Sequence, residues 1–164
     1  MTDTEKNLLV DEPKTYELIE NMLSFWSKAL RSRRIHLGMD EAPEIGRGRF
    51  MNLHGYEPQM SLMSRHLKKV SELCRKYGYE VPSIWSDLYF KLDNPDNPEQ
   101  KSFYSETPKI HDAVKAQIPE SVQLCHCDYY HDKTAFYENY LREHQKAVST
   151  PVQMVSGVWC WAKL

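Results

Sequence analysis

The sequence predicts an α/β fold in which parallel strands alternate with helices, and three observations support this prediction. Short apolar runs alternate with longer stretches in which apolar residues recur at helical spacing. Glycine, proline and Asx residues separate these segments. A cluster of polar or aromatic residues follows each apolar run. Strands that alternate with helices are joined by crossovers and lie parallel, so we expect all of these clusters at one end of one sheet.

The composition is typical of a globular chain that forms a single unit over residues 1–164. Of the 164 residues, 41% are hydrophobic and 27% are charged. The net charge is −2, and lysines and arginines are scattered among acids, so we expect no nucleic acid as a partner. The chain begins without a basic segment followed by an apolar core, and no apolar run is long enough to cross a bilayer, so we expect no membrane partner.

Cysteine usage favours a reducing compartment and gives no support for a metal site. Four cysteines in a chain of this length are too few for a disulfide scaffold, which predicts a cytoplasmic protein. The cluster Cys125-His126-Cys127-Asp128 has the residue types of metal ligands. On a strand, however, the two thiols share one face while His126 and Asp128 share the other. We therefore predict no metal and no cofactor.

The first half of the chain predicts two helices with a strand between them. Asp11 is placed to cap a helix whose first turn contains Pro13, and helical spacing continues to about Arg31. The apolar run 34–38 predicts a strand, and the glycine-rich segment 45–49 predicts a loop. A second helix is expected from near Pro58 to Gly78.

The second half continues the alternation. Residues 81–85 predict a second strand, and 93–98, with two Asn-Pro pairs, predict an exposed excursion. A short helix is expected over 108–117, a third strand over 122–128, a helix capped by Asp132 over 133–148, and a fourth strand over 152–159.

The residues at the carboxyl ends of the four strands are the candidate site, because ligands of parallel α/β sheets bind outside these ends. Acids and aromatic rings dominate there, a combination that suits carbohydrate, since sugar faces stack on rings and carboxylic acids transfer protons at the glycosidic bond. The four clusters are Asp40-Glu41, Trp85-Ser86-Asp87, Asp128-Tyr129-Tyr130 and Trp159-Cys160-Trp161.

Residues 36–41, His-Leu-Gly-Met-Asp-Glu, resemble the His-x-Gly-Gly-Asp-Glu signature of family 20 glycoside hydrolases, the β-N-acetylhexosaminidases. From Leu9 to Trp161 the chain is similar to the bacterial intracellular exo-enzymes of this family. The resemblance implies about half of a (β/α)8 TIM barrel, roughly strands 4 to 7 with their helices. It also implies a retaining exo-hydrolase that removes terminal N-acetylglucosamine or N-acetylgalactosamine, with the substrate's own acetamido group as nucleophile.

The resemblance implies unequal roles for the two acids. Glu41 corresponds to the general acid and base, and Asp40 to the residue that orients the acetamido group. Protonation of Glu41 near neutral pH would need a raised pKa, which burial beside aromatic residues supplies in such sites. His36 lies inside the predicted strand, where we expect it to position the pair and contribute to substrate binding.

Further substrate-binding residues are implied on the other strand ends. Trp85 and either Trp159 or Trp161 correspond to walls of the acetamido pocket, and Tyr130 to the residue that binds the acetamido oxygen. The family's Tyr-x-Asp pattern is met by residues 130–132, while Asp128 is an alternative partner for sugar hydroxyls.

Two departures and the short length qualify the resemblance. Met39 replaces a glycine, and Trp161 stands where many members carry an acid. The arginine that anchors the sugar in this family lies on the barrel's first strand, so we expect the isolated chain to be weakly active or inactive. Half a barrel leaves open edges, which predicts self-association. The alternative functions are a non-catalytic sugar-binding or assembly module and a flavodoxin-like binding domain.

Overall fold

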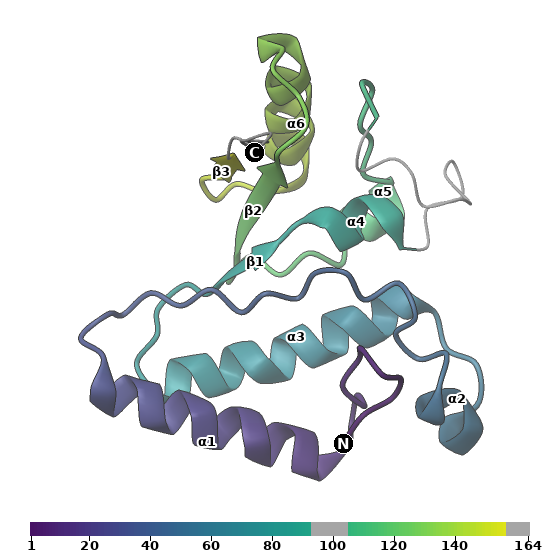
Figure 1. Cartoon of the computed structure of the whole chain (residues 1–164), viewed down its shortest axis with the longest axis vertical. Helices are drawn as coiled ribbons and strands as arrows, with labels where there is room; N and C mark the ends of the chain where they lie inside the picture. Colours follow the sequence, from purple (N-terminus) through teal and green to yellow (C-terminus); the bar gives the residue numbers. More distant parts are fainter. Residues whose placement is uncertain (93–104, 157–164) are drawn as a thin grey trace, which may run out of the picture.

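The computed structural model describes residues 1–92 and 105–156 and confirms an α/β fold with parallel strands. A three-stranded sheet has the order β1-β2-β3, and both pairings are parallel (Figure 1). The strands are β1 (Ser83–Trp85), β2 (Gln123–Asp128) and β3 (Gln153–Ser156). The helices are α1 (Pro13–Ala29), α2 (Arg49–His54), α3 (Gln59–Lys76), α4 (Asp87–Lys91), α5 (Asp112–Lys115) and α6 (Thr134–Ala147).

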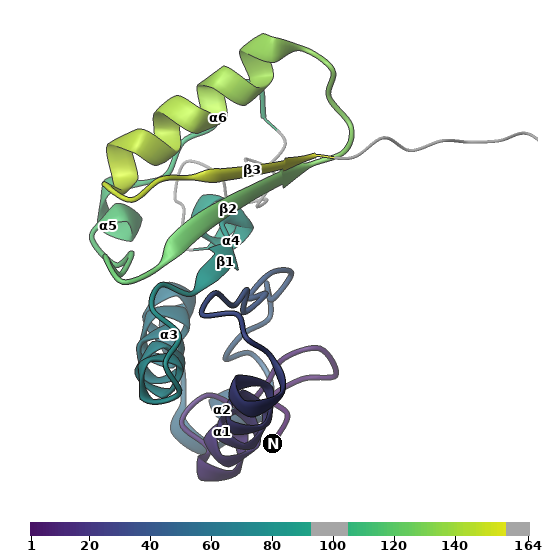
Figure 2. The ribbon, with the colours of Figure 1, turned by 90° about the vertical axis from the view of Figure 1, so that its left-hand side faces the viewer.

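One face of the sheet is covered by helices. Ile84 and Leu124 are ladder partners on this face, and both are fully buried. His126 follows on the same side of β2, where its ring stacks on Tyr140 of α6 at a centroid distance of 4.1 Å. Figure 2 shows α6 lying along β2 and β3 on this side. The opposite face carries Trp85 and the two β2 thiols, so the predicted alternation of residues 125–128 is confirmed.

The helices α1 and α3 lie side by side below the sheet (Figure 1). Their contact is apolar: Leu23 of α1 is buried with Val70 and Cys74 of α3. Ile35 and Leu37, from the segment that precedes β1, pack on this cluster. The α1–α3 layer and α6 therefore cover the same face of the sheet, and the apolar spacing that predicted both long helices marks their buried sides.

The predicted strand 34–38 is an extended segment that pairs with β1 at a single residue. His36 forms an isolated parallel bridge with Ser83, whose N–H donates to Ile35 O at 2.9 Å and whose C=O accepts from Leu37 N at 2.8 Å. The prediction of a full strand is wrong because the backbone turns left-handed at Gly38, with φ 74°. The segment nevertheless extends the sheet, so the parallel segments follow one another in chain order, which is their order around a parallel barrel.

The helix α2 was not predicted, and a residue distant in sequence forms its start. Asp3 is buried, and its carboxylate accepts from Phe50 N at 2.7 Å and from Gly46 N at 2.6 Å. Its backbone oxygen accepts from Arg49 N at 3.0 Å. The amino-terminal loop therefore supplies the cap that α2 lacks locally, since its own N-cap residue, Gly48, has no side chain.

Several other predicted details differ. Asp11 does not cap α1; it adopts φ 65° and pairs with Arg65 and Lys69 of α3. Asp132 is not the cap of α6, whose N-cap is Lys133 without a side-chain bond. The helix predicted over 108–117 is reduced to α5, and α4 was not predicted. Residues 93–98 and the end of the strand predicted over 152–159 lie outside the described residues.

In the two described stretches, no helix combines the length and apolar character needed to span a bilayer.

Three histidines are buried where their neutral form is favoured. Burial lowers the pKa of His126 to about 3 and that of His66 to about 4. Burial also lowers the pKa of His144, whose Nδ1 donates to Tyr140 O at 2.7 Å and whose Nε2 accepts from Ser86 Oγ at 2.9 Å. Protonation of these rings would place a charge in the core.

Acid is therefore expected to destabilise the fold in a window set by these histidines. A histidine with a folded pKa below its usual 6.5 binds fewer protons when folded, so its contribution is complete above about pH 6.5 and declines as the pH falls toward the folded pKa. His126→Phe keeps an aromatic ring beside Tyr140 and removes one titration. Between about pH 7 and pH 5, urea denaturation should show the wild type losing up to about 2 kcal/mol more stability than the variant. Equal losses would contradict this assignment.

Candidate functional site

The segment that carries the two candidate acids is a left-handed turn at the carboxyl end of the first extended segment. Gly38 has φ 74°, Met39 φ 69° and Glu41 φ 48°. Methionine and glutamate rarely adopt this conformation, and non-glycine residues in it are characteristic of functional sites. The turn is attached to β1, because Trp85 N donates to Gly38 O at 2.9 Å.

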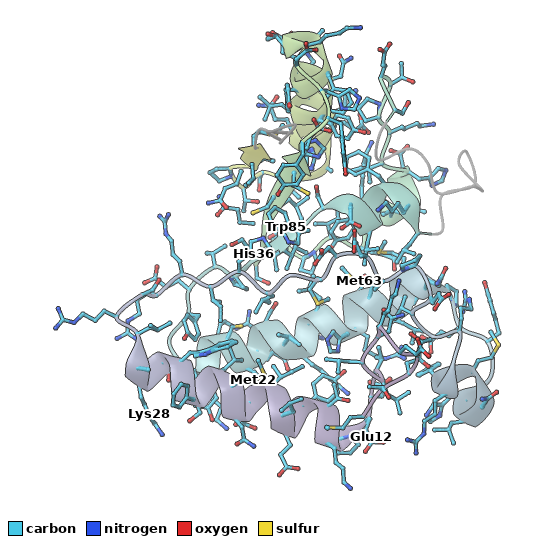
Figure 3. The ribbon with its side chains drawn as sticks, in the orientation of Figure 1. Glu12, Met22, Lys28, His36, Met63 and Trp85 are labelled. Atoms are coloured by element: carbon cyan, nitrogen blue, oxygen red, sulfur yellow. The ribbon has the colours of Figure 1, made fainter. Side chains whose placement is uncertain are left out.

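His36 and Trp85 form an aromatic pair beside this turn. Their ring centroids are 4.4 Å apart with an interplanar angle of 51°, and Figure 3 shows the two side chains next to each other. Gly38 N donates to His36 Nδ1 at 3.0 Å, so the neutral ring carries its proton on Nε2. Partial burial lowers the pKa of His36, and the charge of Asp40 opposes this effect. The structure thus brings His36, Asp40 and Trp85 together, while Nδ1 of His36 holds the turn.

Asp40 and Glu41 are both exposed and line different clefts. Asp40 borders a mostly apolar cleft of about 360 Å³ between α1 and the segment 35–42. Glu41 borders a polar cleft of about 590 Å³ that Lys91 also lines. Lys6 and Asn7 line both clefts, so these meet at the amino-terminal loop. The burial expected around Glu41 is not supplied by the described residues.

A buried ion pair lies behind the turn: Asp87 belongs to the predicted strand-end clusters, but its pairing with Lys91 was not predicted. Asp87, only 3% exposed, pairs with Lys91 at 3.0 Å, and its Oδ2 accepts from Glu41 N at 3.3 Å. Burial raises the pKa of Asp87, and the charge and hydrogen bond of Lys91 oppose the rise. An acid at a strand end followed by lysine four residues later was the available sequence signal.

Cys127 adjoins the acids from the open face of β2. Burial raises the pKa of its thiol, and the charges of Asp87 and Asp40 raise it further. The thiol is therefore kept in its neutral form beside the carboxylates.

Asp128 occupies the helix-covered side of β2 and holds the turn that follows it. Its carboxylate accepts from His131 Nδ1 at 2.8 Å, from Tyr137 Oη at 3.0 Å and from the backbone N–H groups of residues 130 and 131. Burial alone would raise the pKa of Asp128, but these hydrogen bonds together lower it. Tyr130 is 68% exposed. Asp128 does not lie on the face that carries Trp85, and the roles of Asp128 and Tyr130 in substrate binding stay predictions.

Trp159 and Trp161 lie outside the described residues. Within the described part of the chain, no three His, Cys, Asp or Glu side chains are grouped as a metal site requires.

Comparison with known proteins gives similarity at the level of structure. No family model and no curated protein matches the sequence. Among solved structures, the GH20 beta-N-acetylhexosaminidase from Streptomyces coelicolor A3(2) shares 15% identity at a TM-score of 0.49 over 93% of this chain and 22% of that chain. A mutant Streptomyces plicatus beta-hexosaminidase in complex with its product GlcNAc shares 13% identity at a TM-score of 0.49, with the same coverage.

A third structure is Streptomyces plicatus N-acetyl-beta-hexosaminidase in complex with Thio-NAglucal, with 12% identity at a TM-score of 0.46 over 92% of this chain. The chain spans 21% to 22% of the length of these structures.

The Asp87–Lys91 pair should be important for stability. Its side chains are 4% and 17% exposed, and removing one partner of a buried pair leaves a buried charge uncompensated. At neutral pH we expect Lys91→Met to lower the free energy of unfolding by about 3 kcal/mol, and Lys91→Met with Asp87→Asn to recover part of the loss.

Urea denaturation of both variants checks this expectation. Lys76→Met is the matched control, because Lys76 is mostly exposed in its pair with Glu20 and should have a much smaller effect. A Lys91→Met variant no less stable than the control would show that the pair does not support the turn.

Proposed function

We propose that this chain carries the acid-bearing part of a glycoside hydrolase site that removes terminal N-acetylhexosamine from glycans. The observation that carries the proposal is the left-handed turn, which exposes Asp40 and Glu41 and directly follows His36, whose ring pairs with that of Trp85. The resemblance of residues 36–41 to the family 20 signature supplies the chemistry.

In this proposal Glu41 is the proton donor. A sugar at the polar cleft would have its glycosidic oxygen on the side of Glu41, which protonates it as the bond to the anomeric carbon breaks. The oxygen of the substrate's acetamido group forms the new bond to this carbon, giving an oxazolinium intermediate. Glu41, now ionised, takes a proton from the water that attacks the anomeric carbon as the bond from this carbon to the acetamido oxygen breaks. Both displacements invert the anomeric carbon, so the configuration is retained.

Asp40 has a different task. Its carboxylate is exposed just beyond the segment 35–38 and interacts with His36, so it is placed to accept a hydrogen bond from the acetamido N–H and to align the carbonyl oxygen. Trp85 offers an apolar surface for the acetamido methyl or the sugar face. The separate clefts of Asp40 and Glu41 agree with these unequal roles.

A cyclic thiazoline mimic of the oxazolinium intermediate tests the proposal. A catalytic pocket favours the intermediate over the product, so the mimic should bind at least about tenfold more tightly than N-acetylglucosamine in calorimetry. Trp85→Ala and Asp40→Asn should each abolish this preference. Tyr56→Ala, at a ring that is 71% exposed on the loop after α2, is the matched control and should retain it.

Equal binding of mimic and sugar would favour the alternative, a sugar-binding module without turnover. Binding of neither would contradict the proposed substrate class.

Turnover by the 164-residue chain alone should be very low. The described residues leave Glu41 exposed to solvent, so they do not enclose a substrate against it as an oriented proton transfer requires. Release of an aryl alcohol from an aryl N-acetyl-β-glucosaminide, followed by absorbance, measures this. Ready turnover that Glu41→Gln abolishes would show that the chain by itself is a complete catalyst.

A further inference from the structure

Among the described residues the sheet has two outer edges, and both belong to parallel segments. The first edge is the segment 35–38, bridged to β1 through His36 and Ser83. The second edge is β3, which pairs with β2 alone among the described strands. Parallel strands need a neighbour of the same direction to complete their hydrogen bonds, and unpaired edges promote association with another chain.

A groove runs along the first edge. The apolar cleft of about 360 Å³ has one wall formed by α1 and another formed by the edge segment. Met22 and Leu18 of α1 line it and are 40% and 39% exposed. Figure 3 shows Met22 on α1, in the layer below the segment that carries His36. The apolar side chains that line both walls include Leu18, Met22, Trp26, Ile35, Leu37 and Met39.

The backbone of this edge is suited to receive a strand. Ile35 O and Leu37 N bond to Ser83, and in a parallel pairing the peptide groups of the intervening residue point the other way. Both the N–H and the C=O of His36 are therefore directed away from β1. Within the described residues neither group has a backbone hydrogen bond.

The second edge, β3, carries exposed apolar side chains that could fill the groove. Met154 and Val155 of β3 are each 37% exposed, although they lie in a sheet. Met154 is the ladder partner of His126, on the helix-covered face, and Val155 is the partner of Cys127, on the open face. If β3 were placed beside the segment 35–38 with its helix-covered side still facing the helices, Met154 would point toward α1.

We propose that the groove between α1 and the segment 35–38 binds β3 of a second copy of this chain. Each copy then gives its β3 to the groove of the other, so two equivalent seams related by a two-fold axis pair both of the described edges. The segment 35–38, β1, β2 and β3 of two copies supply eight parallel segments, which is the number that closes a parallel α/β barrel.

The structure favours a second copy over intramolecular pairing. The occupant must be an extended apolar strand with a free edge and the direction of β1, and β3 has these features among the described strands. In its own chain β3 is separated from the groove by β1 and β2, so it cannot reach it. The proposal does not depend on the proposed function, because assembly is measured without sugar.

Sedimentation velocity over a concentration series tests the proposal. The wild type should sediment with twice the mass of the chain at about 50 µM. Met22→Glu and Leu18→Glu place a charge in the groove, and Met154→Lys places one on β3; each should weaken the dimer at least about tenfold. These residues are partly exposed in the single chain, so the variants should retain the wild-type circular dichroism spectrum.

Mixing the variants identifies the surfaces that meet. In a dimer of one Met22→Glu copy and one Met154→Lys copy, the first seam joins the unchanged groove of the Met154→Lys copy to the unchanged β3 of the Met22→Glu copy. In the second seam the introduced glutamate faces the introduced lysine. The mixture should therefore regain dimers that neither variant forms alone. Leu53→Glu is the matched control, because Leu53 is an apolar residue, 56% exposed, on α2 and outside the groove; it should remain dimeric.

A wild type that stays monomeric at about 100 µM would overturn the proposal. So would a mixture that remains monomeric, or dimers that persist unchanged in both Met22→Glu and Met154→Lys.

Discussion

The two backbone hydrogen bonds of Ser83 to the segment before β1 are the interaction on which the candidate site depends. They hold Ile35 and Leu37 in register with the sheet, and the bond from Trp85 to Gly38 continues the attachment as far as the turn. Because the attachment is to backbone, it places the turn whatever side chains it carries. His36 consequently lies beside Trp85, and Asp40 and Glu41 emerge at the sheet's carboxyl end.

The order of the strands determines which face of the sheet is left uncovered. Successive segments are neighbours in chain order, so α1, α3 and α6 all cover one face and the other face is left to His36, Trp85 and Cys127. A doubly wound sheet would have helices on both faces and a single crevice between them. Winding in one direction instead makes the segment 35–38 and β3 the two outer edges among the described residues. These are the edges that our assembly proposal pairs.

The turn that carries the acids is supported from two distant parts of the chain. Asp87, paired with Lys91, accepts a hydrogen bond from Glu41 N. The amino-terminal loop borders both clefts, and its Asp3 fixes the glycine-rich segment that follows the turn. Local sequence preference opposes the left-handed conformation of Met39 and Glu41, so these contacts are what maintain it. A site built in this way is sensitive to residues that never touch a ligand.

The sequence by itself determined the class of the fold, the two long helices and the approximate positions of the strands, because apolar periodicity reports which side of a local element is buried. It also singled out Asp40 and Glu41 through a short motif. Only the tertiary structure decided that residues 34–38 pair at one position, that Asp3 caps α2, that Asp128 holds its own turn on the helix-covered side, and that Asp87 lies beneath the acids. The pairing of residues 34–38, the cap from Asp3 and the position of Asp87 depend on partners distant in sequence, which leave no local pattern to read. The partners of Asp128 are near it in the chain, but which face of the sheet the helices cover is decided by packing.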